Sequence, residues 1–335
     1  MTLGMTQTGH AISESSAAQV AQRARAASHA LARLSVEARN EVLLAAAQAI
    51  EANAAKILAA NAIDCRAAES AVAAGTMSAA MFARLRVTER GVTLMAKQVR
   101  EVAQLPDPLG RRISATELDD GLELYKETCP LGVIGIVFEA RPEVVPQVAS
   151  LALKSGNAVI LKGGSEASHS NEALVEIWRG SLAKFPAVPM DSVNLLKTRA
   201  DVLELLTLDR DVDLIIPRGS RALVEFVSRN SRIPVLGHGE GICHVYVDRA
   251  ADMKKALDVT YDAKVQGPAI CNAAETLLVH EKIAREFLPA MVAKLKKAGV
   301  ELRGCAKTIA LLPNEGVIPA TEQDWATEYS DLILH

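Results

Sequence analysis

The sequence predicts an α/β fold in which helices cover both faces of a doubly wound parallel sheet. From residue 132 onward, short apolar segments alternate with helical stretches. These segments are nearly continuous runs of Val, Ile and Leu, which is typical of parallel strands buried on both faces. Ligands bind at the carboxyl ends of the strands in such a sheet, so the loops that follow the strands are the candidate functional positions. The predicted strands are 133–138, 158–161, 193–196, 214–216 and 245–247.

Helices are predicted before and between these strands. Apolar residues recur at helical spacing from Val20 to Leu34, and the pattern continues past Ser35 to Ile50. We interpret this region as long amphipathic helices of the domain rather than a transit peptide, after a short frayed leader over residues 1–12. No secretory h-region is present. The helices between the strands are predicted at about 143–154, 168–184, 200–206, 219–229 and 252–263.

A β-hairpin is predicted at about 111–128. Two alternating segments flank an Asp-Gly turn at Asp119, Asp120 and Gly121. Polar residues occur on both faces, and a hairpin of this kind is marginally stable alone. We therefore expect it to project from the domain and to contact another subunit.

Composition restricts the classes of function. The 335 residues are 50% hydrophobic and 23% charged, which suits one large or two medium domains. A net charge of -3 and an aromatic content of 3% do not favour a nucleic-acid partner. No apolar run approaches the ~20 residues of a membrane span. The cysteines form no CxxC pair, which indicates a reducing, cytoplasmic setting, and no metal site is predicted because His238 and His244 lack suitable partners.

Cys271 is the candidate nucleophile. It lies on a loop that contains Gly267 and Pro268, directly before the apolar segment 275–279. A thiol presented on such a loop can face a cleft. The alternative is that Cys271 is a small buried hydrophobic residue, as most single cysteines are.

Two strand ends carry candidate phosphate-binding loops. Strand 158–161 runs into Lys162, Gly163, Gly164 and Ser165, where paired glycines let backbone amides approach an anion and the lysine adds a positive charge. Strand 214–216 runs into Gly219 and Ser220 just before a helix, whose free amides offer a second site. Taken singly, each loop is better explained as a plain turn with a helix cap. Together they favour a dinucleotide that is bound without a GxGxxG motif.

Four longer strings carry a resemblance to a known family. They are CPLGVIGIVFEARP at 129–142, KSGNAVILKGGSE at 154–166, ICHVYVD at 242–248 and CNAAETLLVH at 271–280. They resemble the aldehyde dehydrogenase superfamily and, within it, the gamma-glutamyl phosphate reductase family. The resemblance covers nearly the whole chain from about residue 20. It implies an NADP-binding domain at 1–240, which includes the hairpin as an oligomerisation arm, and a catalytic domain at 241–335.

The resemblance also implies roles for single residues. Cys271 matches the nucleophile, and Asn272 with nearby amides is expected to stabilise the oxyanion. Lys162 matches the lysine that reaches the adenosine ribose, with Gly163, Gly164 and Ser165 beside it. Gly219 and Ser220 match the turn that faces the pyrophosphate, and Glu328 is the candidate contact of the nicotinamide ribose. Arg141 is a candidate anion-binding residue for the substrate, with an ion pair to Glu139 or Glu143 as the alternative.

The implied activity is the NADPH-dependent reduction of L-glutamyl 5-phosphate to L-glutamate 5-semialdehyde in proline biosynthesis. NADP(H) is the implied cofactor, and a homo-oligomer and a contact with glutamate 5-kinase are the implied partners. Hydrolytic members of the superfamily carry a Glu-Leu-Gly-Gly run, whereas the stretch 236–241 here offers only His238 or Glu240 as an acid. A hydrolytic dehydrogenase that uses the same cysteine is one alternative, and the missing run speaks against it. The other is a non-catalytic relative, because family members continue beyond His335 and the catalytic domain is expected to be incomplete.

Overall fold

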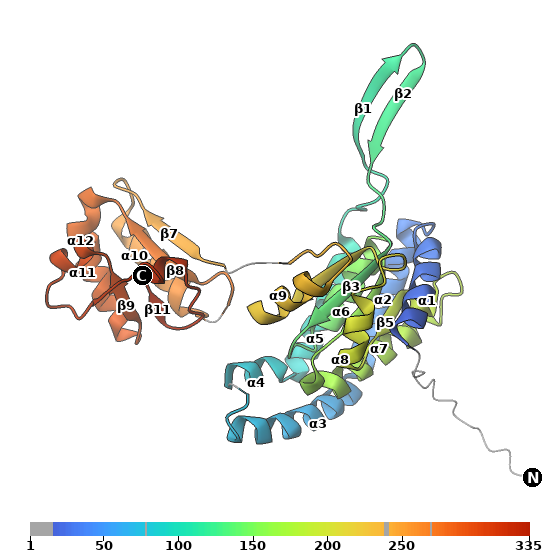
Figure 1. The fold of residues 1–335 in the computed structure, drawn as a ribbon, viewed down its shortest axis with the longest axis horizontal. Coiled ribbons are helices and arrows are strands. Elements are labelled where there is room, and N and C mark those ends of the chain that lie inside the picture. The colour runs from blue at the N-terminus through green and yellow to red at the C-terminus, as the bar shows by residue number, and fades with distance from the viewer. Residues whose placement is uncertain (1–15, 78, 238–240, 269) are drawn as a thin grey trace, which may run out of the picture. The chain divides into compact units, whose positions relative to one another are not determined.

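The computed structural model describes residues 16–77, 79–237, 241–268 and 270–335 (Figure 1). The chain forms two compact units, unit 1 over 1–238 and unit 2 over 239–335. The division lies beside the domain boundary that we predict after residue 240. Each unit has its own hydrophobic core. The predicted leader over residues 1–12 lies outside the described residues.

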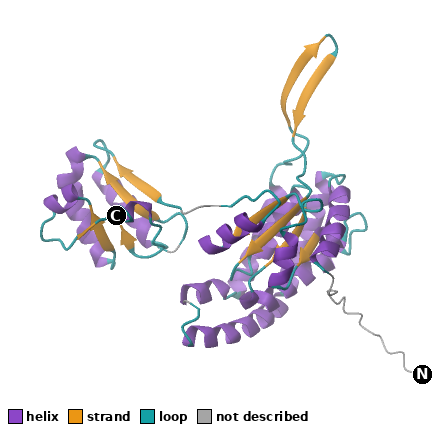
Figure 2. Cartoon of the chain, viewed as in Figure 1, coloured by secondary structure: helices purple, strands orange, loops and turns teal. Residues whose placement is uncertain are grey.

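Unit 1 is built on a four-stranded parallel sheet. Its strands are β3 (Val133–Phe138), β4 (Ala158–Lys162), β5 (Val193–Leu195) and β6 (Leu214–Arg218), in the order β5-β4-β3-β6. Figure 2 shows the strands in orange and the helices around them in purple. Every residue of β3 is buried, so the sheet is covered on both faces, and the predicted doubly wound sheet is confirmed. The chain moves outward from β3 to β5 and then returns to the other side of β3. This reversal of strand order between β3 and β6 is the position where open α/β sheets bind ligands.

Helices surround the sheet of unit 1. The apolar pattern that continues past Ser35 belongs to two helices, α1 (Ala17–Leu31) and α2 (Val36–Ala52), because the Ser35 side chain accepts a bond from the Ala38 N–H at 3.3 Å and caps α2. The remaining helices of unit 1 are α3 (Ala54–Ala73), α4 (Ala79–Leu85), α5 (Glu89–Gln104), α6 (Val144–Lys154), η1 (Ser165–Ala167), α7 (Ser168–Leu182), η2 (Met190–Ser192), α8 (Arg199–Leu205) and α9 (Arg221–Asn230).

The predicted hairpin is present as β1 (Arg112–Asp119) and β2 (Leu122–Glu127). Asp119 pairs with Leu122, and Gly121 takes a positive φ of 75° in the turn between them. Every residue of both strands is exposed, and the hairpin extends away from the rest of unit 1 (Figure 1).

Unit 2 contains two small parallel sheets. The strand predicted at 245–247 is β7 (Cys243–Val247), but placing it in the first sheet was wrong. It pairs with β8 (Ala274–Val279) because α10 (Met253–Val265) returns the chain beside it. The backbone of His335 joins β8 to the other sheet through bonds with Glu275 and Leu277. The other elements of unit 2 are α11 (Glu281–Lys297), β9 (Glu301–Gly304), α12 (Ala306–Leu311), β10 (Ile318–Pro319), η3 (Asp324–Ala326) and β11 (Ile333–Leu334).

No single helix within the described residues is long and apolar enough to cross a membrane. Only α2 and α3 taken together, with a bend of 65° between them, reach the length and apolar composition of a membrane span in this part of the chain.

A buried carboxylate fixes the start of α7, the helix that follows the Lys162 loop. Asp64 of α3 is 3% exposed, and it accepts bonds from the backbone and hydroxyl of Ser170 at 2.8 and 2.6 Å. It also accepts bonds from the backbone and ring of His169. The two donors of Ser170, which is fully buried, would lose their partner in a dry interior if Asp64 were removed.

We expect Asp64→Ala to lower the free energy of unfolding by about 3 kcal/mol, since several buried donors lose their acceptor. Urea unfolding followed by circular dichroism measures this change. Asp209→Ala, at an exposed position with no such contacts among the described residues, is the control and should stay within about 0.5 kcal/mol. An equal loss in both variants would contradict the role of Asp64.

Candidate active site

The predicted Gly219–Ser220 turn directly follows β6, next to the position where the strand order of the sheet reverses. The Ser220 backbone N–H donates to Oε2 of Glu139 at 2.8 Å, and its hydroxyl donates to Oε1 at 3.1 Å. A Cβ at Gly219 would collide with the same carboxylate, so only glycine permits this approach. Ser220 also caps α9 by accepting a bond from Leu223. The Ser220 amide, which belongs to the turn that we predict to bind a phosphate, therefore binds a carboxylate of the protein itself.

The predicted Lys162 loop lies at the carboxyl end of β4, next to β3 in the sheet. A Cβ at Gly163 would collide with Asn171, and a Cβ at Gly164 would collide with Glu166. Asn171 is 2% exposed, and its Oδ1 has no hydrogen-bond partner in the described part of the chain. A small cavity of about 30 Å³ lies over this loop. It is lined by Gly163, Gly164, Ser165, Ser168, Asn171, Glu172, Leu195, Leu196 and Lys197.

Arg141 follows β3 and is half-buried. Across the described residues it forms no ion pair with Glu139 or Glu143, the alternative that we considered. Burial raises the pKa of Glu143, and the nearby charge of Arg141 only partly offsets this. Ala140 takes a positive φ of 30°, with its N–H donating to Glu166 at 2.6 Å. The guanidinium of Arg141 thus remains available to an anion.

Unit 2 brings Cys271 and Glu328 together through Gly241. Cys271 is exposed on the loop between α10 and β8. A Cβ at Gly241 would lie 2.9 Å from the Cys271 carbonyl oxygen, so the two backbones are in contact. The Gly241 N–H donates to Oε2 of Glu328 at 2.8 Å. Cys243 also reaches the same carbonyl, with Sγ at 3.6 Å. Two candidate residues that are far apart in sequence thereby lie on adjoining segments.

Asn272 is exposed beside Cys271. Its side-chain amide has no hydrogen-bond partner among the described residues. His238 and Glu240, our two candidate acids, lie outside the described residues. No cluster of three or more metal-ligating side chains occurs in the ranges that the structure describes.

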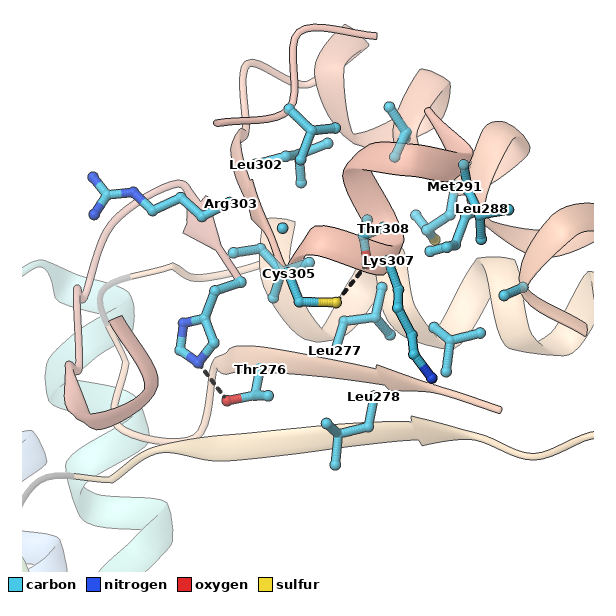
Figure 3. Close-up of a pocket in the computed structure, with 18 of the residues that line it drawn as sticks. Thr276, Leu277, Leu278, Leu288, Met291, Leu302, Arg303, Cys305, Lys307 and Thr308 are labelled. Carbon is cyan, nitrogen blue, oxygen red and sulfur yellow. Dashed lines mark hydrogen bonds between the residues drawn. The ribbon is translucent and has the colours of Figure 1, made fainter. Parts of the chain in front are cut away.

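A cavity of about 690 Å³ lies elsewhere in unit 2, between β8, α11, β9 and α12 (Figure 3). Cys305 lines it, and the hydrogen bond of its thiol to Thr308 at 3.4 Å lowers the pKa of Cys305. Most of the other labelled side chains are apolar (Figure 3). Cys271 is not among the lining residues, so this cavity is separate from the candidate nucleophile.

Sequence reasoning missed Glu139, Asn171, Lys197 and Cys243 as neighbours of the candidate site. Asn171 lies within α7 and Lys197 follows β5, so neither belongs to the loop motif that they approach. Cys243 falls within the ICHVYVD string, but only the pairing of β7 with β8 brings it near Cys271. No local signal distinguishes these residues from ordinary core and surface positions.

Comparisons with known proteins decide the family. The family model described as "Aldehyde dehydrogenase family" matches residues 5–303. The chain belongs to this family. Aldehyde dehydrogenase family members use nicotinamide cofactors. The predicted family and fold are therefore confirmed.

The most similar relatives share one name. A gamma-glutamyl phosphate reductase of Nostoc punctiforme is 52% identical over 315 residues, covering 94% of this chain and 71% of the relative. One of Natronomonas pharaonis is 51% identical, covering 93% of this chain and 70% of the relative. The crystal structure of the gamma-glutamyl phosphate reductase of Thermotoga maritima superposes with a TM-score of 0.88 at 41% identity, covering 96% of this chain and 76% of that one.

The position of Glu139 leads to a binding prediction. Glu139→Gln keeps the size of the side chain but removes one negative charge from the amides of the Gly219–Ser220 turn. We expect ADP to bind about threefold to tenfold more tightly, since an anion then meets less repulsion there. Isothermal titration calorimetry measures the Kd.

Glu204→Gln is the matched control, because Glu204 also receives two helix N-terminal amides, those of Ala17 and Ala18 at 3.1 and 3.3 Å. It should leave the Kd for ADP unchanged. Tightening by the same factor in both variants would show only an effect of net charge and would contradict the assignment of the turn.

Proposed function

We propose that this chain catalyses the NADPH-dependent reduction of L-glutamyl 5-phosphate to L-glutamate 5-semialdehyde and phosphate, a step of proline biosynthesis. The observation that carries the proposal is its identity of about half with relatives named gamma-glutamyl phosphate reductase, over 94% of the chain in one case. The exposed thiol of Cys271, next to Asn272 in the chain, supports it with the chemistry that an acyl phosphate requires.

Cys271 acts as the nucleophile in the proposed mechanism. Its thiolate attacks the acyl carbon, the S–C bond forms, and phosphate leaves with the electron pair of the C–O bond, which gives a thioester. Asn272 and the amides near Cys271 donate to the oxyanion of this step. When bound, NADPH supplies the hydride that reduces the acyl group. Cleavage of the C–S bond then returns the thiol of Cys271 and releases the semialdehyde.

The residues of unit 1 suit a phosphate-bearing nucleotide. The orphaned Oδ1 of buried Asn171 offers an acceptor to a hydroxyl, and Lys162 places positive charge at the end of β4. Lys197 also lines the small cavity, where it is paired with Glu172 at 3.0 Å. We propose NADPH as the cofactor because the relatives' family implies it, and these residues are compatible with a phosphate-bearing nucleotide. The residues that we propose to hold it are Lys162, Gly163, Gly164, Ser165, Gly219 and Ser220 in unit 1 and Glu328 in unit 2.

Arg141 is proposed to bind the substrate. Its guanidinium makes no ion pair with the two glutamates beside it, and a planar guanidinium binds carboxylate or phosphate groups through paired hydrogen bonds. L-glutamyl 5-phosphate carries both groups. Arg141 therefore has a suitable partner in the proposed substrate.

The hairpin is proposed as an oligomerisation arm. Ile113, Leu118, Leu122 and Leu124 are each more than half exposed, at 55 to 61%. So much apolar surface on a two-stranded element favours burial against another copy of the chain. The proposal is that the hairpin of one subunit contacts its neighbour.

The mechanism predicts the effect of removing the thiol. Cys271→Ala should reduce NADP⁺ reduction with glutamate semialdehyde and phosphate by at least about 10⁴-fold, because no other group forms the acyl intermediate. The reaction is followed by absorbance of the reduced cofactor, with and without phosphate. Turnover of the wild-type chain should require phosphate.

Cys305→Ala is the matched control, because Cys305 is also exposed but lies in the separate cavity. It should retain wild-type turnover. Phosphate-independent turnover of the wild type would instead identify a hydrolytic dehydrogenase. Loss of activity in Cys305→Ala with retention in Cys271→Ala would contradict the choice of nucleophile.

The hairpin makes a separate prediction. Leu122→Asp combined with Leu124→Asp places two charges on one face of β2, and burying them against a neighbour costs several kcal/mol. Light scattering after size exclusion should show a smaller assembly than the wild type forms. Glu123→Gln, on the opposite face of β2, should leave the assembly unchanged. An unaltered mass in the double variant would show that the hairpin is not the contact.

A further inference from the structure

A buried ion pair joins the two ends of the loop that carries Cys271. Lys264 lies in the last turn of α10, and Glu275 is the second residue of β8. The Lys264 Nζ donates to Oε2 of Glu275 at 3.0 Å, and the two side chains are 0% and 2% exposed. The pair spans the segment 266–273, so it fixes where this loop begins and ends.

The second oxygen of the same carboxylate reaches another segment. Oε1 of Glu275 accepts a bond from the Ser330 N–H at 3.2 Å. Ser330 has a positive φ of 51°, which residues other than glycine rarely adopt, so this bond helps to maintain a strained turn. Glu328 lies two residues before Ser330. The bond from Ser330 to Glu275 therefore also restrains the chain segment that contains Glu328.

These contacts close into a ring. Glu328 accepts the bond from Gly241, and Gly241 packs against the carbonyl of Cys271. The chain from Cys271 leads to Glu275, which accepts the bond from Ser330, and Ser330 lies two residues after Glu328. A displacement of Glu275 would thus move Cys271 and Glu328 relative to each other.

A second set of side chains holds the Glu328 segment but does not reach the Cys271 loop. Arg303 donates to the Tyr329 hydroxyl at 3.1 Å, and that hydroxyl bonds to Asp324. Burial, together with this bond, raises the pKa of Tyr329 to about 12, so it remains a donor. The backbone of His335 also joins the end of this segment to β8, through bonds with Glu275 and Leu277. The side chain of Glu275 and the Gly241 N–H are the contacts that act at Ser330 and Glu328 themselves.

Stability alone does not explain a fully buried ion pair. Desolvating an ammonium and a carboxylate offsets most of their attraction, and apolar side chains of similar size often replace such pairs without loss. We propose that Glu275, with its charge balanced by Lys264, is a positioning residue that sets Cys271 against Glu328. The proposal rests on the proposed function, in which Cys271 is the nucleophile and Glu328 contacts the cofactor.

The test compares variants of the full chain. Glu275→Gln keeps the shape of the side chain but leaves the ammonium of Lys264 without its counter-charge. The double variant Lys264→Met with Glu275→Leu removes both charges and the bond to Ser330. Asp258→Asn is the matched control, because Asp258 lies on the same helix and bonds to Lys254 and Lys294 at exposed positions.

Two readouts are needed. The first is hydrogen exchange of the peptides that cover 266–273 and 328–330, and the second is steady-state kinetics, which gives the kcat and the KM for NADP⁺. We expect Glu275→Gln to accelerate exchange in both segments and to raise the KM about tenfold, a size usual for coupled residues. The double apolar variant should have the Tm of the wild type. Its KM for NADP⁺ should stay raised, because the Ser330 N–H still lacks the acceptor that Glu275 provides. Asp258→Asn should match the wild type in both readouts.

A further comparison uses Glu328→Gln. Combined with Glu275→Gln, it should raise the KM no more than either change alone, since both act on the same contact. Three results would each overturn the proposal. The first is that the effects of Glu275→Gln and Glu328→Gln on the KM multiply in the double variant, and the second is that Glu275→Gln leaves hydrogen exchange in the two segments unchanged. The third is that the double apolar variant recovers the wild-type KM together with the wild-type Tm. Phosphate-dependent turnover by Cys271→Ala would overturn the proposed function instead, so the two failures are distinguishable.

Discussion

The close packing of Gly241 against the carbonyl of Cys271 is the constraint on which the rest of unit 2 depends. Any side chain at position 241 would approach that oxygen to 2.9 Å, so the segment before β7 and the loop before β8 meet only through glycine. Because they meet, the Gly241 N–H is directed at Glu328. The backbone contact of Gly241 with Cys271 and its bond to the Glu328 carboxylate thereby bring the segments of the candidate nucleophile and the candidate cofactor ligand together.

Unit 1 uses glycine in the same way. Gly219 permits the carboxylate of Glu139 to reach the amides at the start of α9, and Gly163 permits Asn171 to lie on the Lys162 loop. The two loops follow β4 and β6, the strands on either side of β3 in the parallel sheet, so both lie at its carboxyl edge. This edge therefore carries the two candidate anion-binding loops, neither of which has a GxGxxG motif.

The sequence predicts β3 with its observed bounds, because 133–138 is an unbroken apolar run bounded by Gly132. It also places Lys162, Ser220 and Cys271 at element ends. It does not separate α1 from α2, because the apolar spacing continues through the cap at Ser35. The assignment of 245–247 to the first sheet fails because strand pairing is not local. Likewise, the link from Glu275 to Ser330 spans 55 residues, and no pattern around either residue signals it.

The account depends on a covalent acyl group on Cys271, and trapping this group tests it most directly. The wild-type chain is incubated with glutamate semialdehyde and NADP⁺ without phosphate, then digested and examined by mass spectrometry. The account predicts a glutamyl group on the peptide that contains Cys271, and its loss when phosphate is added. A glutamyl group on the peptide that contains Cys305, or no covalent group while reduced cofactor forms, would contradict it.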